Sequence, residues 1–281
     1  MARERTRGPD AVGEVNRASA DARATVARYA RHQGWADDGE RMVLNRIADE
    51  VRGRRVLDVG VGAGRTAWVL RLLTAEYVAI DVAPAMVEAC RRRYPGLPVA
   101  VGDARDLRGF GDASFSLVLF SINGIDALDH DDRLASLHEF RRVLEPGGLL
   151  VYSTTSLDGP HFASRPWRVR ELRHRVHTLL EPATGSTLRQ AVEPVASFAR
   201  SCRNWSRLRS LGSMGDGWAV GVHPADEFSV VLHFTRPATE LATLESVGFA
   251  VEVVIAADGS PVTGPTTLAP WFHLVARARA L

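Results

Sequence analysis

Several residue types and patterns that mark particular protein classes are scarce in this chain or absent from it. Only Cys90 and Cys202 are cysteines, so no disulfide framework exists and a reducing compartment is indicated. No Cys/His group has the spacing of a zinc site. No apolar run reaches the roughly 18 residues of a membrane span. The N-terminal MARERTRGPD lacks the apolar core of a secretory signal. We therefore expect a cytoplasmic protein without a bound metal.

Lysine is absent as well, since all 35 basic residues are arginines. The chain therefore has no side-chain amine for Schiff-base chemistry. Its net charge of +2 is too small to indicate nucleic-acid binding. Apolar residues at 46% and charged residues at 24% are typical of a globular protein that buries a full core.

The spacing of apolar residues divides the chain into four parts. The first 25 residues are polar and predict a loosely helical arm, whereas residues 37–51 have apolar side chains at helical spacing, with Asp37 or Asp38 as the cap. We expect an N-terminal helical arm (1–50), an α/β core (51–155), a substrate-covering insertion (156–235) and a C-terminal helix with strands that complete the sheet (236–281).

Short apolar runs alternate with helix-like segments through the core. The runs lie at 56–59, 77–80, 98–101, 115–120 and 149–152, and helical segments at 64–74, 84–94 and 131–144 separate most of them. After the insertion follow a helix at 237–247 and strands at 249–255 and 271–276. Buried strands separated by helices predict a parallel sheet covered on both faces. The expected fold class is α/β, with a doubly wound, mostly parallel sheet of seven strands.

A glycine-rich turn follows the first run. Gly60, Gly62 and Gly64 occupy every second position of the turn that joins a predicted strand to a predicted helix. Glycine in such a turn permits positive φ and close approach of a ligand to the backbone. A dinucleotide fingerprint has its third glycine one position later, where this chain has Arg65. Asp58, just before the turn, would repel a pyrophosphate, whereas a cationic amino acid would be attracted to it or to a water that it holds. Both features argue against a nicotinamide oxidoreductase and favour a cofactor that carries an ammonium group.

Over residues 55–155 the chain resembles the class I S-adenosylmethionine (SAM)-dependent methyltransferases, and more loosely a bacterial branch of them that acts on small molecules. Five segments match the family's motifs in order and spacing: 58–64, 79–82, 102–107, 120–124 and 141–148. The resemblance implies a Rossmann-like methyltransferase fold, with N-terminal helices and a helical or irregular insertion after the fifth strand. It also implies SAM as cofactor and S-adenosylhomocysteine as product.

The resemblance further implies a set of cofactor-binding residues. Asp81 is expected to hold both ribose hydroxyls, because a carboxylate accepts two hydrogen bonds at once. Asp103 would accept from the adenine amino group, and the segment from Ser121 would lie near the transferred methyl group. The complete set is Asp58, Gly60, Val61, Gly62, Gly64, Arg65, Asp81, Val82, Met86, Asp103, Ala104, Arg105, Ser121 and Ile122.

Other roles for these residues stay open from the sequence. Taken singly, Asp58 could cap a strand end, Asp81 could cap the following helix, and Asp103 could form an Asx turn. Arg65 could pair with the cofactor carboxylate or lie solvated on the helix that follows the glycine turn.

Methyl transfer from a sulfonium depends mainly on alignment of nucleophile, methyl and sulfur, and needs a base only when the acceptor enters protonated. No spacing motif identifies such a base. Ligands in open α/β sheets bind beyond the carboxyl ends of the strands, which makes Asn123, His161 and His233 the candidate catalytic residues. A structural or surface role is the alternative for each histidine.

The sequence therefore predicts SAM-dependent methylation of an O, N or C atom of a small-molecule acceptor of the secondary-metabolite type. Two alternatives keep the cofactor: a cyclase or lyase that releases methylthioadenosine, and a non-catalytic SAM-binding regulator. Residues 121–124 read Ser-Ile-Asn-Gly and differ from the acid-or-Asn-Pro-Pro-aromatic motif that holds a flipped base. We expect no nucleic-acid or membrane partner, and a monomer or homodimer.

Overall fold

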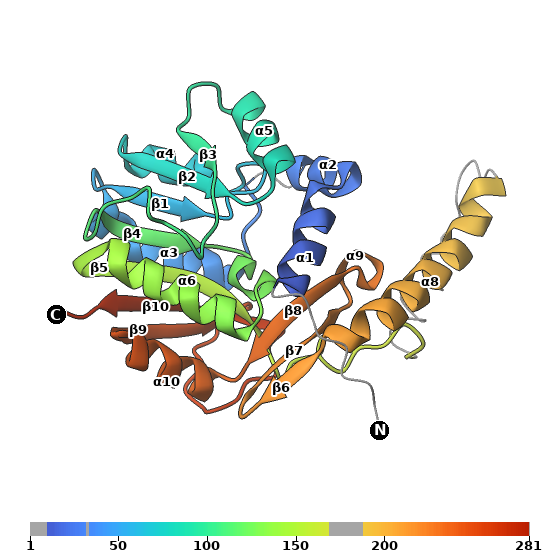
Figure 1. Cartoon of the computed structure of the whole chain (residues 1–281). Helices are drawn as coiled ribbons and strands as arrows, with labels where there is room; N and C mark the ends of the chain where they lie inside the picture. Colours follow the sequence, from blue (N-terminus) through green and yellow to red (C-terminus); the bar gives the residue numbers. More distant parts are fainter. Residues whose placement is uncertain (1–9, 32–33, 169–187, 281) are drawn as a thin grey trace.

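Five parallel strands form the centre of the molecule (Figure 1). The computed structural model describes residues 10–31, 34–168 and 188–280. The central strands lie in the order β3 (Val99–Val101), β2 (Tyr77–Asp81), β1 (Val56–Val59), β4 (Phe115–Phe120) and β5 (Leu144–Ser156). The strand order reverses between β1 and β4, and open α/β sheets bind ligands in the crevice beyond the carboxyl ends of such a strand pair.

Two C-terminal strands extend this sheet. β10 (Trp271–Ala278) runs antiparallel to β5, and β9 (Phe249–Ala256) runs antiparallel to β10. Together with the five parallel strands they form the doubly wound, mostly parallel α/β arrangement that the sequence predicts.

The sheet is larger than expected, with ten strands instead of seven. The additional strands are β6 (Ser213–Gly215), β7 (Trp218–His223) and β8 (Val230–Thr235), all from the segment expected to be a helical or irregular insertion. β4 ends at Phe120, opposite Tyr152 of β5. The longer β5 therefore has a free edge beyond that point, and β8 pairs with it in parallel at Thr155 and Ser156. The insertion thus continues the sheet.

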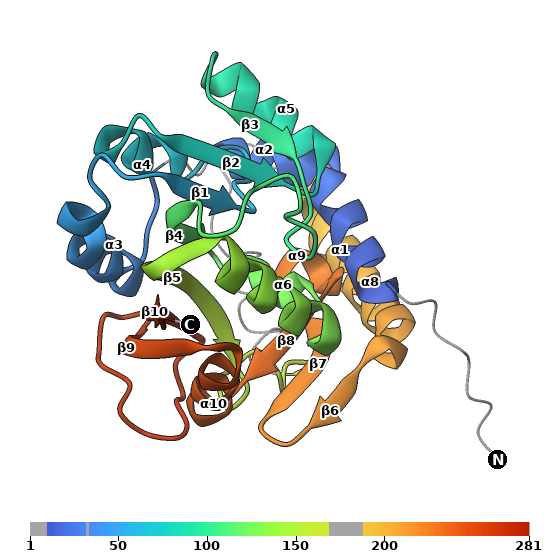
Figure 2. The same ribbon diagram turned by 60° about the vertical axis from the view of Figure 1, so that its left-hand side comes forward.

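Helices cover both faces of the sheet (Figure 2). On one face the apolar sides of α3, α4 and α5 are packed against β1, β2 and β4, whereas α6 and α10 pack on the opposite face. Their bounds are Asp38–Val51 (α3), Ala67–Leu73 (α4), Pro84–Arg93 (α5), His130–Val143 (α6) and Pro237–Val247 (α10). Of the two possible caps of α3, Asp37 is the one used, because its side chain accepts from the N–H of Glu40.

The N-terminal segment is more firmly packed than the loosely helical arm that its polarity predicts. It forms α1 (Ala11–Asp21) and α2 (Arg23–Arg31). Asn16 of α1 is buried; its amide donates to the carbonyls of Ala127 and Val231, and its oxygen accepts from the N–H of Val231. A polar side chain that satisfies backbone groups of two other segments fixes α1 against the sheet, which apolar periodicity cannot reveal.

The insertion also contains α8 (Leu188–Leu208), η2 (Arg209–Leu211) and α9 (Ala225–Phe228). The far end of α8 extends away from the sheet in Figure 1, while Leu208 at its near end packs with Val220 and Phe228. α9 is a left-handed turn, since Asp226, Glu227 and Phe228 have φ of +50°, +58° and +60°. Non-glycine residues adopt this conformation at a cost, and only where the surrounding structure holds them.

A buried ion network lies where η1 (Gly124–Ala127), β5 and α10 meet. Arg133 of α6 donates to Asp126 (2.7 Å) and to Glu240 (2.6 Å), and all three side chains are almost fully buried. Asp126 also accepts from the hydroxyl of Thr154 (2.7 Å) and from the backbone N–H of Thr155 (2.6 Å). Burial raises the pKa of Asp126 to about 6, although Arg133 opposes that shift. The network fixes the segment after β4 against the end of β5.

Candidate functional site

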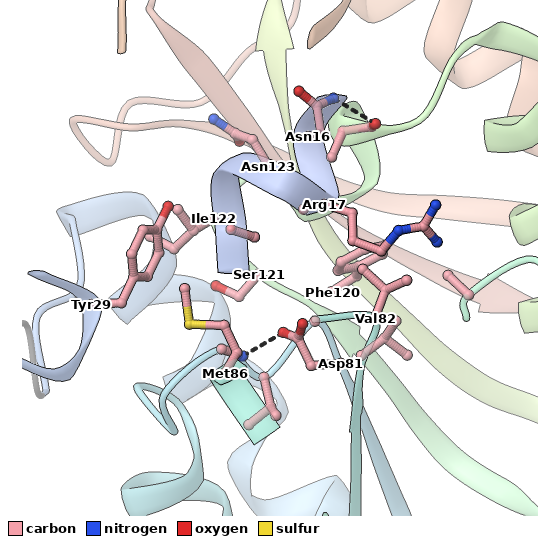
Figure 3. Close-up of a pocket in the computed structure, with 18 of the residues that line it drawn as sticks. Asn16, Arg17, Tyr29, Asp81, Val82, Met86, Phe120, Ser121, Ile122 and Asn123 are labelled. Atoms are coloured by element: carbon pink, nitrogen blue, oxygen red, sulfur yellow. Dashed lines mark hydrogen bonds between the residues drawn. The ribbon is translucent and has the colours of Figure 1, made fainter. Parts of the chain in front are cut away.

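A cavity of about 410 Å³ opens beyond the carboxyl ends of β1, β2, β3 and β4 (Figure 3). One half, here called the glycine-turn half, is formed by 59–62, Asp81, Val82, Met86 and 102–105, with Arg17 of α1 and Tyr29 of α2. The other, the insertion half, is formed by Ala127, Leu128, His223, Ala225, Asp226, Val230, Leu232 and Trp271. Residues 120–124, which follow β4, line the cavity as well.

The glycine turn brings backbone close to the cavity. Gly60 and Gly62 have φ of +64° and +56°, which only glycine adopts readily. A Cβ at Gly60 would lie 2.4 Å from the Phe120 ring, so a side chain is excluded there. A Cβ at Gly64 would instead meet the Tyr94 ring at 2.7 Å. Gly64 therefore serves the packing of α5 and, contrary to the expectation, does not line the cavity.

Asp81, expected at the cofactor, is placed and oriented in the cavity wall. Its Oδ2 accepts from the N–H of Gly62 and its Oδ1 from the N–H of Ala83, both at 2.8 Å. It is 8% exposed, and burial raises its pKa although the two backbone donors oppose the shift. Because a carboxylate has about four lone-pair sites, both oxygens keep acceptor capacity for a ligand. Figure 3 shows Asp81, Met86 and Ser121 around one space.

Asp58 does not line the cavity, so its carboxylate does not contact a ligand there directly, and the expected attraction of a cationic amino acid through a water that it holds stays a prediction. The carboxylate is buried behind the turn, where it accepts from Thr66 Oγ1 (2.6 Å) and from the Tyr77 hydroxyl (2.8 Å). Burial raises its pKa to about 6, against the two hydrogen bonds. Asp58 thus links β1, β2 and the start of α4 from below the cavity.

Arg65 lies at the cavity and is already paired. Its guanidinium donates to both carboxylate oxygens of Glu40, at 2.8 and 2.7 Å, and to the hydroxyl of Ser121. The Ser121 hydroxyl in turn donates to Glu40. The Arg65 side chain is 12% exposed and that of Glu40 4%, so the solvated alternative is wrong. Sequence reasoning missed Glu40, because an acid in the first turn of a helix is usually explained by the helix dipole.

Arg105 is the centre of an ion cluster at the loop after β3. It pairs with Asp103 (2.6 Å), with Asp132 of α6 (2.7 Å) and with Asp10 (3.0 Å) beside α1. Burial alone would raise the pKa of Asp103, but hydrogen bonds from Arg105 lower it. Asp103, Ala104 and Arg105 all line the cavity, as do Val61, Val82, Met86 and Ile122.

Of the three candidate catalytic residues, only Asn123 lines the cavity. It has φ of +53°, and its N–H donates to Ser153 Oγ at 2.8 Å. Its Oδ1 is buried and has no hydrogen-bond partner among the described residues. This oxygen has almost no accessible surface, so it does not face the cavity that the rest of the side chain lines.

His233 and His161 do not line the cavity, which removes them from direct contact with a ligand there. His233 is 2% exposed, stacks with Trp218, and has its Nε2 3.2 Å from Nδ1 of His130. Burial keeps its pKa well below the usual value. His161 lies behind His223, with ring centroids 4.7 Å apart. The strand-end rule alone cannot tell which way a histidine ring is directed.

His223, at the end of β7, is the histidine that lines the cavity. Its Nδ1 accepts from the N–H of Ala225 at 3.1 Å. Burial, together with the nearby His161, lowers its pKa to about 3. Sequence reasoning missed His223 because β7 was not expected; the available signal was the apolar alternation just before His-Pro.

The described residues contain no group of three His, Cys, Asp or Glu side chains that could hold a metal ion. Within the same ranges, no helix has the length and apolar character needed to cross a membrane.

Comparisons with known proteins agree on one kind of domain. A family model described as a methyltransferase domain matches residues 56–148. A demethylmenaquinone methyltransferase of Beutenbergia cavernae is 30% identical over 194 residues, which are 67% of this chain and 76% of that protein. A phthiotriol/phenolphthiotriol dimycocerosates methyltransferase of Mycobacterium leprae is 35% identical over 127 residues, which are 42% of this chain and only 46% of that protein.

Among solved structures, the CcbJ methyltransferase of Streptomyces caelestis superposes with a TM-score of 0.53 and 17% identity, covering 87% of this chain and 91% of that one. At this identity the likeness shows the fold alone.

Proposed function

Since the chain belongs to the SAM-dependent methyltransferases, we propose that it transfers the methyl group of SAM to an oxygen, nitrogen or carbon atom of a small-molecule acceptor. The observation that carries the proposal is the preset carboxylate of Asp81, at the carboxyl end of β2 in the wall of the cavity. Two backbone N–H groups fix its orientation before any ligand arrives, and its remaining acceptor sites suit a vicinal diol.

The other residues of the glycine-turn half fit the same cofactor. Gly62 leaves room for close approach to the backbone, since the nearest atom to a Cβ there would be Tyr29 at 3.9 Å, while Val82 and Met86 supply apolar surface for a purine. Asp103 offers a carboxylate to an exocyclic amino group. The bound sulfonium supplies an activated methyl group, so the chain's own contribution is to bind and orient the two reactants and to exclude water.

The acceptor is assigned to the insertion half, next to Asn123. This half is built from β7, β8, η1 and β10, the segments that sequence analysis could not connect to the family's motifs. Asn123 is the residue we place nearest the reaction, because it follows β4 and lines the cavity. It has no basic nitrogen, so it orients the acceptor instead of deprotonating it.

Calorimetric titration with SAM tests the proposal. We expect micromolar binding and at least a tenfold loss in Asp81→Ala, or about 1.4 kcal/mol. Asp106→Ala is the matched control, since Asp106 is an exposed acid near Asp103 whose side chain pairs with Arg108, and it should bind SAM like the unaltered protein. Absence of SAM binding to the intact chain, or an unchanged affinity in Asp81→Ala, would contradict the proposal.

Analysis of the cofactor product after incubation with candidate acceptors separates the reaction classes. S-adenosylhomocysteine is expected. Methylthioadenosine would indicate a cyclase or lyase, and SAM binding without turnover on any acceptor would indicate a regulator.

A further inference from the structure

The insertion half of the cavity has apolar walls. Four apolar side chains line it: Leu128, which directly follows η1, Val230 and Leu232 of β8, and Trp271 of β10. The indole N–H of Trp271 donates to Asp37 at 2.7 Å, so this ring offers no free donor to a ligand. Such walls favour an acceptor with an apolar body, because burying apolar surface contributes about 25 cal/mol per Å².

Formal charge in this half is neutralised by the protein itself. Asp226 is its one acidic residue among the described lining residues, and its carboxylate accepts from both terminal nitrogens of Arg28 on α2. A charged acceptor would therefore lose its hydration without meeting an uncompensated opposite charge, which is costly in a site with apolar walls.

His223 supplies a hydrogen-bond donor. Because its Nδ1 accepts from the N–H of Ala225, the neutral ring carries its proton on Nε2. The low pKa of about 3, caused by burial and His161, keeps the ring neutral at physiological pH. In this tautomer the one nitrogen with a free lone pair is already occupied, so His223 donates a hydrogen bond and does not act as a base.

The hydrogen-bond donor of His223 selects what the ligand must carry. A group that accepts from Nε2 needs a lone pair, which the oxygen of a hydroxyl group has and an ammonium lacks. Asn123 lines the cavity, but its Oδ1 has almost no accessible surface and therefore does not serve as an acceptor for the ligand.

We propose that the insertion half binds an uncharged, apolar molecule that carries a hydroxyl group, with His223 as hydrogen-bond donor to its oxygen. The inference rests on the proposed function, because it names the chemical class of the acceptor in that site. It assigns recognition to His223 and leaves the methylated atom unassigned.

The test uses three naphthalene derivatives of similar size that differ in charge: neutral 1-naphthol, anionic 1-naphthoate and cationic 1-naphthylmethylammonium. Each is titrated at neutral pH by calorimetry into the full chain saturated with S-adenosylhomocysteine. We expect 1-naphthol to bind at least about tenfold more tightly than either ion, since one such factor corresponds to the loss of a single well-placed hydrogen bond. Preference for either ion, or no 1-naphthol binding, overturns the inference.

Two substitutions at one position separate a donor from a base. His223→Gln keeps an N–H close to the position of Nε2 without a basic nitrogen, and should hold 1-naphthol within about threefold of the unaltered protein. His223→Leu removes the donor and should weaken binding about tenfold. His138→Leu, on the exposed side of α6, is the control and should change nothing. If His223→Gln binds as weakly as His223→Leu, the imidazole itself is required and the donor role is wrong.

The affinity for S-adenosylhomocysteine shows whether a negative result contradicts the proposed function or only the inference about the acceptor. Each variant is first titrated with that ligand alone, which also reports correct folding of the glycine-turn half. If the unaltered chain fails to bind it, the proposed function fails. If it binds while 1-naphthol shows no preference over the ions, only the inference about the acceptor fails.

Discussion

Glu40 and Arg65 form a two-point ion pair, 2.7 and 2.8 Å long, between α3 and the glycine turn. Both side chains are largely buried, and Ser121 joins them from the segment after β4. The pair therefore connects α3 to two segments that line the cavity. Because buried pairs leave an uncompensated charge when one partner is removed, the interaction has measurable consequences for folding and for SAM binding.

Glu40→Ala should lower the free energy of unfolding by about 3 kcal/mol, because it leaves the Arg65 guanidinium buried and unpaired. Arg65→Ala should have a similar effect, and the double variant should be less destabilised than the sum by about 2 kcal/mol. Urea unfolding of the four proteins measures this cycle. Strictly additive losses would mean that the pair contributes nothing.

The buried Asp58 predicts a specific dependence of stability on pH. Its pKa in the folded protein is about 6, against 3.8 in the unfolded chain. The folded state therefore binds its proton more tightly, so this contribution to stability is full below pH 3.8 and is lost as the pH rises through about 6. Asp58→Asn has no such loss and can still accept from Thr66 and Tyr77.

Relative to the unaltered protein, Asp58→Asn should gain about 3 kcal/mol of stability between roughly pH 4 and pH 7. Urea unfolding of both proteins across this range measures the difference, and the contribution of Asp126 cancels because both proteins retain it. Parallel pH profiles would mean that Asp58 ionises normally in the folded chain.

Arg133 should be among the positions where substitution is most destabilising. Arg133→Met removes the cation shared by Asp126 and Glu240 in a region that excludes water, and should cost about 3–5 kcal/mol. Arg142→Met is the control on the same helix, because Arg142 is partly exposed and its pairs with Glu139 and Asp112 should contribute less than about 1 kcal/mol. Chemical unfolding measures both. Equal losses would contradict the burial argument.

The ion pair between Arg28 and Asp226 joins α2 to the left-handed turn of α9 beside the cavity. Arg28 is 42% exposed, so the pair should contribute less than about 1 kcal/mol to folding. Its main effect should be on ligand exchange, because it holds α2 next to the cavity residues of α9. Arg28→Ala should raise the dissociation rate of S-adenosylhomocysteine by about threefold or more.

Stopped-flow tryptophan fluorescence measures that rate. Arg200→Ala is the control, since Arg200 pairs with the neighbouring Glu227 of the same turn, and residue 227 does not line the cavity. If both variants release the ligand equally fast, the turn as a whole is responsible and the Arg28 pair has no special role.

Sequence analysis predicted the regular part of the fold because local signals agree there with the packing. The helices α3, α5, α6 and α10 lie close to their expected bounds, since caps, prolines and apolar spacing all indicate the same ends. The glycine turn and Asp81 were found for the same reason. A short motif near a strand end determines both backbone conformation and position in the sheet.

The remainder depends on contacts between distant segments. β8 forms because β5 continues past β4, and no local pattern shows how long a neighbouring strand is. Glu40 of α3 pairs with Arg65, and His223 of β7 lines the cavity. Both residues are too far from the glycine turn in the sequence for a spacing motif to connect them with it. Asp58 was assigned to the ligand, whereas Thr66 and Tyr77 use its oxygens below the turn. Side-chain direction at a strand end is a tertiary property.

The continuity of β5 has a consequence for how such enzymes diversify. Thr155 and Ser156 pair with β8, and they belong to the same strand, β5, that pairs with β4 and β10. A single strand therefore joins the strands of the insertion to the cofactor-binding core. A chimera that exchanges residues after 155 for those of a relative would cut inside this shared strand. Recombination that preserves folding should instead keep β5 whole and join the foreign segment after residue 157, so that acceptor preference can change while the core sheet is retained.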